Sequence, residues 1–155
     1  MNDREVGGMG PEPQGDMVHV NVASPAGSYT VGSTSFFRYI VRLAEMGLSL
    51  KPSDRESVEM LANIPHAFFD DGIASGNGWR IVPPNSMEDW PVMEATPQRL
   101  RAALQAARRI LWENAAPVGV SAGDIVMIEE ELDHVFGILQ RAEAAGFSVN
   151  ISYVS

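Results

Sequence analysis

Two stretches of alternating apolar and polar residues lie near opposite ends of the chain. Three valines alternate with polar residues over Met17–Val22, and Phe147–Val154 repeats the pattern with serine and asparagine at the polar positions. A period of two is typical of a strand with one buried face. We therefore predict strands over these two stretches, a turn at Ser24–Gly27 after the first, and a third, short strand over Trp79–Val82.

Apolar residues recur at helical spacing in four other stretches, each preceded by residues that can cap a helix. Serine and threonine hydroxyls at such positions accept hydrogen bonds from the free amides of the first turn. Ser53 with Glu56 is predicted to form a capping box, and Gly146 a left-handed C-cap. The predicted helices begin after Ser33–Ser35, at Ser53, at Thr96 and at Ser121; they end near Gly47, near Pro65, at Asn114 and at Gly146, respectively.

Three segments lack a regular pattern. Met1–Asp16 combines glycine, proline and acidic residues, so it buries too little apolar area to offset its ordering entropy, and we predict a disordered leader. Gly72–Gly78 is predicted as a flexible turn, because it lacks the lysine and the strand-to-helix setting of a phosphate-binding loop. Asn85–Ala95 is predicted as an irregular connection anchored by Trp90.

Helices dominate this pattern, with strands at both ends and one in the middle. A chain of this length suits one compact domain with a real core, whereas two full domains would be cramped. We predict a single α+β domain over residues 17–155, with about four helices packed on a small sheet that includes strands near both termini. The C-terminal strand has few charges to discourage edge pairing, so it could extend the sheet between molecules and form a homo-oligomer.

The net charge is −9 over 155 residues, and Lys51 is the only lysine. Clustered lysine and arginine supply most of the affinity for phosphate groups, so we expect neither direct nucleic-acid binding nor binding to an anionic membrane surface. An acidic balance instead favours solubility and fast encounter with a basic protein partner.

The chain has no cysteine, which excludes disulfides, thiol nucleophiles and thiolate metal sites. The N-terminal segment lacks the basic start and apolar core of a signal peptide. No apolar run approaches the roughly 20 residues that are needed to span a bilayer. We therefore expect a cytoplasmic protein that has no membrane association and no cofactor.

The last two predicted helices carry opposite charge. Thr96–Asn114 holds four arginines, whereas Ser121–Gly146 holds six acidic residues against one arginine. Arg101 and Arg108 share a helix face beside Trp112, where they could hold a carboxylate or stack a planar ligand. The favoured interpretation is that both arginines pair with acids of the following helix, so that part of the opposite charge of the two helices cancels within the molecule. The candidate partners are Glu129, Glu130 and Asp133.

The acidic run of the last helix is also a candidate docking surface. Such a run is usually a solvated helix face, but exposed acids would attract a basic protein. Trp90, if exposed beside its acidic neighbours, would supply an aromatic anchor of the kind found at interfaces. The candidate partner-binding residues are Glu88, Asp89, Trp90, Glu129, Glu130 and Asp133.

His66, Asp70 and Asp71 form the best cluster for acid–base or metal chemistry, because a four-residue helical step places His66 and Asp70 on one face. Two ligands do not close a metal site, and no serine lies in the setting of a nucleophile elbow. A surface helix terminus is the favoured interpretation of this cluster. We predict no metal site and no catalytic residue.

In size, charge and lack of cysteine, the chain resembles small acidic bacterial immunity proteins, which neutralise toxins by occluding them. The resemblance lies in composition and not in a motif. We predict a non-enzymatic acidic binding domain, of the immunity or inhibitor kind and of bacterial or phage origin, that occludes a basic protein. The alternatives are a small enzyme or ligand-binding domain that uses His66, Asp70 and Asp71, and a homo-oligomeric structural or assembly protein.

Overall fold

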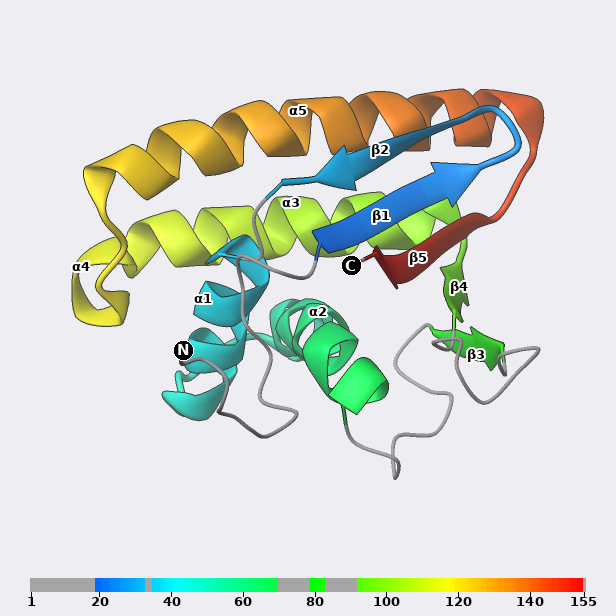
Figure 1. The fold of residues 1–155 in the computed structure, drawn as a ribbon. Coiled ribbons are helices and arrows are strands. Elements are labelled where there is room, and N and C mark those ends of the chain that lie inside the picture. Colours follow the sequence, from blue (N-terminus) through cyan, green and yellow to red (C-terminus); the bar gives the residue numbers. More distant parts are fainter. Residues whose placement is uncertain (1–18, 33–34, 70–78, 83–91, 155) are drawn as a thin grey trace, which may run out of the picture.

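The computed structural model describes residues 19–32, 35–69, 79–82 and 92–154 (Figure 1). It confirms the predicted α+β class, with helices packed on an antiparallel sheet. Four of its helices correspond to the predicted ones, and the additional helix is the single turn α4. Along the chain the elements are β1 (His19–Ser24), β2 (Gly27–Val31), α1 (Ser35–Glu45), α2 (Pro52–Phe69), β3 (Arg80–Val82), β4 (Val92–Ala95), α3 (Pro97–Glu113), α4 (Ala115–Val118), α5 (Ala122–Ala145) and β5 (Val149–Val154).

The described strands form one sheet in the order β2-β1-β5-β4-β3, and neighbouring strands are antiparallel throughout. β5 lies at the centre: it pairs with β1 from His19↔Val154 to Ala23↔Asn150, and with β4 on its other side. The expectation that the C-terminal strand could extend the sheet between molecules is therefore wrong, because β5 has a neighbour on each side. The edge strands are β2 and β3.

Two of the strands, β2 and β4, lie where the sequence pattern predicted none. β2 follows the predicted turn and returns beside β1 as a hairpin, in which the Ala26 amide donates to the Ser24 hydroxyl at 3.1 Å. β4 lies inside the stretch predicted to be an irregular connection. Each strand is only four or five residues long and buries few apolar side chains, so the period of two is too short to recognise.

The core lies between the sheet and the helices. Figure 1 shows α3 and α5 side by side along the sheet, with β2 next to α5, and the two helices contact each other. Polar residues take alternate strand positions: the Thr30 hydroxyl, for example, donates to the Asn21 side-chain oxygen at 3.0 Å. The strand residues buried in the core are Val20, Val22, Val31, Met93, Ala95, Val149 and Ile151.

The ends of α3 and α5 confirm the predicted caps. Thr96 accepts from the Arg99 amide, and Ser121 accepts from the Asp124 amide at 3.1 Å. Gly146 ends α5 in the left-handed conformation, with φ of 78°. This conformation strains any residue that has a Cβ, so glycine is favoured there.

Helix α2 differs from its prediction at both ends. It begins at Pro52, and the Arg55 amide donates to the Lys51 carbonyl at 2.9 Å, so Ser53 lies in the first turn and not at the N-cap. Proline is favoured at the first helical position because its fixed φ suits the helix and it has no amide to satisfy. The helix also continues past Pro65 to Phe69.

Candidate functional site: the outward face of helix α5

Helix α5 runs antiparallel to α3, and α4 forms the turn between them (Figure 1). Its apolar stripe faces the core, where Ile128, Leu132 and Leu139 are at most 4% exposed. Its other sides face α3, strand β2 and the surface. The acidic residues of α5 therefore lie in different environments, which decide whether each one is free to meet a partner.

The side of α5 that faces α3 is neutralised by ion pairs. Arg108 lies 3.4 Å from Glu129, and Arg101 pairs with Glu143 further along the two helices. The predicted pairing of the α3 arginines with α5 is therefore confirmed, although Arg101 takes Glu143 and not one of the three acids expected. Part of the charge reversal between the helices is cancelled within the molecule.

Glu129 is the centre of a small polar cluster. Its second carboxylate oxygen accepts from the Trp112 indole N–H at 2.7 Å, while the Arg108 guanidinium lies 5.4 Å from the centre of the Phe136 ring. This predicted partner-binding residue is thus half-buried and occupied. Its first role is to hold Trp112 and Arg108 against α5.

Two further acids of α5 hold the fold together. Asp124 accepts from the Tyr39 hydroxyl of α1 at 2.5 Å, and this hydrogen bond raises the pKa of Tyr39 above its ordinary value. Glu131 accepts from the Gly32 amide at 2.8 Å, at the end of β2. Both carboxylates are committed to contacts between α5 and other elements.

Glu130 and Asp133 differ from these four acids. Both side chains are exposed, and neither makes a hydrogen bond or ion pair with another described residue. Burial, together with the charges of Glu131 and Glu130, raises the pKa of Tyr29 on β2, whose ring stacks on His134 with centroids 4.7 Å apart. Of the acids predicted to bind a partner that lie within the described residues, these two are open to solvent.

An apolar residue that the sequence reasoning did not select lies on the same face. Val126 is 64% exposed, the largest exposed fraction among the exposed large apolar residues of the described chain. Asp133 follows seven positions later, which is two helical turns, so the two residues lie on one face. The sequence could have revealed the exposure of Val126, because this residue falls outside the helical stripe of Ile125, Ile128 and Leu132.

A shallow groove of about 460 Å³ lies where α3, α4 and α5 meet. The apolar groups of its lining are Trp112, Ala115 and Ile125, each of them half-buried. The charged groups are Arg108 and Glu129, which pair with each other. The groove therefore presents an apolar surface whose charged groups pair with each other, and Val126 follows the lining residue Ile125 in the chain.

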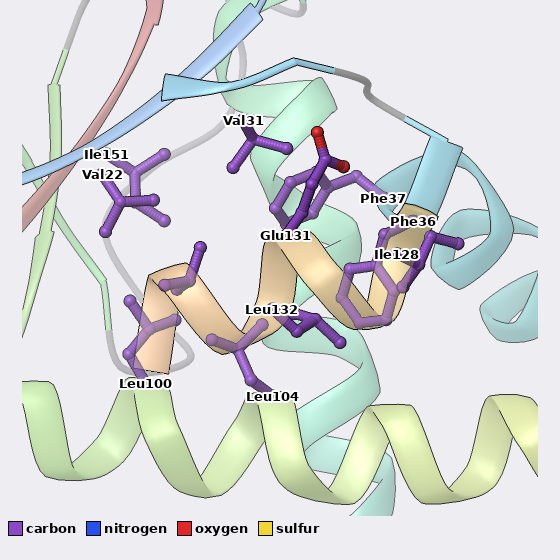
Figure 2. Close-up of a pocket in the computed structure, with 11 residues that line it drawn as sticks. Val22, Val31, Phe36, Phe37, Leu100, Leu104, Ile128, Glu131, Leu132 and Ile151 are labelled. Atoms are coloured by element: carbon purple, nitrogen blue, oxygen red, sulfur yellow. The ribbon is translucent and has the colours of Figure 1, made fainter. Parts of the chain in front are cut away.

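A second cavity lies inside the core (Figure 2). It measures about 20 Å³, and its lining is apolar apart from Glu131. Figure 2 shows the Glu131 carboxylate beside Val31, consistent with its hydrogen bond to Gly32. About one water molecule fills such a volume, and an apolar lining gives that water few partners. This cavity is a packing defect of the core and not a ligand site.

Several candidate residues lie outside the described part of the chain. These are Glu88, Asp89 and Trp90 of the predicted docking surface, and Asp70 and Asp71 of the predicted acid–base cluster. His66 lies within α2, in a portion of the helix whose side chains are not described. Within residues 19–32, 35–69, 79–82 and 92–154, no group of three His, Asp or Glu side chains could hold a metal ion.

The fold and this surface define an α+β domain that presents an acidic, partly apolar helix face. None of the described helices combines the length and apolar character needed to cross a membrane. No protein-family model, curated protein or solved structure matches the chain.

Proposed function

We propose that this protein is a non-enzymatic binding domain that occludes a basic protein partner with the outward face of α5. The observation that carries this proposal is the division among the acids of α5. Asp124, Glu129, Glu131 and Glu143 are engaged within the molecule, whereas Glu130 and Asp133 are exposed without a described partner. Charges that the fold itself does not use are available for recognition.

The position of these two acids suits electrostatic steering. They lie on a helix of 24 residues that is anchored to the core along its length, so their carboxylates are held on a rigid support. The net charge of −9 adds a long-range attraction for a basic protein. Exposed charges of this kind mainly accelerate association and select partners by charge.

Occlusion of a basic protein is the mode of action of immunity and inhibitor proteins, which this chain resembles in size, charge and lack of cysteine. The proposed role is therefore that of an immunity or inhibitor protein. The enzyme alternative stays a prediction, because Asp70 and Asp71 lie outside the described residues. The oligomer alternative no longer has β5 as its interface, because that strand is central.

The test has two stages. The folded protein first serves as bait in its native host, beside the double variant Glu130→Lys, Asp133→Lys, and mass spectrometry identifies any partner lost in the variant. Association rates with that purified partner are then measured over a range of salt concentrations. We expect the variant to associate more slowly at low salt, and the difference to narrow as salt screens the charges.

A matched control comes from α2. Glu56→Lys, Glu59→Lys changes the net charge by the same amount at two exposed positions of another helix. The association rate of this control should fall much less than that of the α5 variant. Both variants lose the same long-range attraction, but only the α5 variant loses the local contact with the partner. Equal rates for both variants at low salt would show that the outward face of α5 is not the binding surface.

A further inference from the structure

The groove between α3, α4 and α5 has a feature that the proposed function does not use. Its apolar lining is formed by Trp112, Ala115 and Ile125, and Trp112 is the aromatic residue among the lining residues. The indole N–H already donates to Glu129 at 2.7 Å. A partner side chain that covers the ring would therefore remove apolar area from water without leaving a buried donor unpaired.

The charges around the groove are arranged unequally. Arg108 and Glu129 line it and cancel each other. Beyond them, Glu130 and Asp133 are exposed on the same helix, one or two turns from Ile125, and the exposed Val126 directly follows Ile125 in the chain. The exposed charges around the apolar groove are thus acidic. They favour binding of an apolar side chain whose neighbours in the partner are lysine or arginine.

We propose that this groove is the anchor site for an apolar side chain of a basic amphipathic segment, whose flanking lysine or arginine residues meet Glu130 and Asp133. The inference rests on the proposed function. In it, the groove provides most of the binding affinity, and Glu130 and Asp133 increase the rate of association. An apolar anchor in a pocket beside charged contacts is a common division of roles at protein interfaces. The partner class is thereby narrowed from any basic protein to one that presents an apolar residue between cations.

The first experiment uses a helical amphipathic peptide made of leucine and lysine as the probe. Heteronuclear NMR of the full chain follows the Trp112 indole N–H and the methyl groups of Ile125 and Val126 during titration. These signals should shift and saturate together. The Trp79 indole is an internal control, because it is 4% exposed and donates to the Met60 carbonyl at 2.7 Å, so its signal should stay in place.

A peptide of the same pattern with glutamate in place of lysine controls for apolar character alone. It should shift none of these signals at matched concentration, because the acids beside the groove repel it. If the leucine–lysine peptide shifts backbone signals near Glu130 and Asp133 but leaves Trp112, Ile125 and Val126 unchanged, the groove is not the anchor, although the acidic face still binds. If it shifts neither set, both the anchor and the proposed function are contradicted.

Variants separate the apolar contact from folding and from charge. Val126→Gln removes the exposed apolar group with no change in charge, and Met46→Gln makes the same kind of change at an exposed residue after α1. We expect Val126→Gln to weaken peptide binding by about tenfold, as for a partly buried aliphatic group, with the salt dependence retained. Met46→Gln should bind as the wild type does. Equal affinity of the two variants would overturn the anchor role of the groove.

Discussion

The inward and outward sides of α5 belong to one continuous helix, yet they differ in what their residues contact. On the inward side, Leu139 and Ala142 are fully buried in the core. On the outward side, Glu130 and Asp133 are exposed and contact no described side chain by hydrogen bond or ion pair, and Val126 is 64% exposed. The inward residues therefore determine whether the protein folds, while the outward residues can change with little effect on folding.

Between these sides lie acids that belong to neither. Glu129 and Glu143 reach α3, Asp124 reaches α1, and Glu131 reaches the end of β2. The helix thus uses charge mainly to attach itself to its neighbours. A count of acidic residues along α5 overestimates the charge available to a partner, because four of the six charges serve these attachments.

The largest expected effect is on the inward side. Leu139→Ala removes a side chain with no exposed area, and it should lower the free energy of unfolding by about 2–5 kcal/mol through lost burial and the cavity left behind. Urea unfolding followed by circular dichroism measures this change. Glu130→Ala, on the outward side, should stay within about 0.5 kcal/mol of the wild type. Similar losses for the two variants would remove the distinction between the sides.

A smaller effect is expected at the side that faces α3. Glu129→Ala deprives both the Trp112 indole and Arg108 of their acceptor, which should lower the free energy of unfolding by about 1–2 kcal/mol because the site is only half-buried. Tryptophan fluorescence during urea unfolding measures it, and Glu130→Ala is again the control. If the two neighbouring alanine variants are equally stable, Glu129 is as free as Glu130, and the division among the acids fails.

The smallest effect concerns the attachment of α5 to α1. Tyr39→Phe removes the hydrogen bond to Asp124, which should cost about 1 kcal/mol at neutral pH. The folded protein raises the pKa of Tyr39 above 10.0, so this contribution is complete below the unfolded pKa and is lost as pH rises through the folded pKa. Urea unfolding at neutral and strongly alkaline pH should show the gap between the variant and the wild type closing. A gap that stays constant would show that the phenol's proton is not held by Asp124.

Most elements could be predicted from the sequence because their signals are local. The strands β1 and β5 and the four long helices follow from periodicity over six or more residues, and Thr96, Ser121 and Gly146 cap helices as expected. The strands β2 and β4 were not predicted because each buries only one or two apolar side chains. The start of α2 was misplaced because Pro52 is a stronger first-turn signal than the Ser53 hydroxyl.

The proposed binding surface was less predictable from the sequence because it depends on how two helices meet. The pairing of Arg108 with Glu129 could be anticipated from charge, but the contact of Trp112 with Glu129 depends on the crossing of α3 and α5. The same is true of the groove lined by Trp112, Ala115 and Ile125. Sheet order also lies beyond local patterns, since β5 pairs with strands on both sides that are distant in the sequence.

The central place of β5 has a consequence for the order of events during synthesis. The β1–β2 hairpin is synthesised before the other described elements, but two strands alone are marginally stable in water. Their neighbour in the sheet, β5, is the last described element to leave the ribosome. We therefore expect the nascent chain to remain without its sheet until β5 has been synthesised, so that a chain that stops before β5 cannot join the β1–β2 hairpin to β4 and β3.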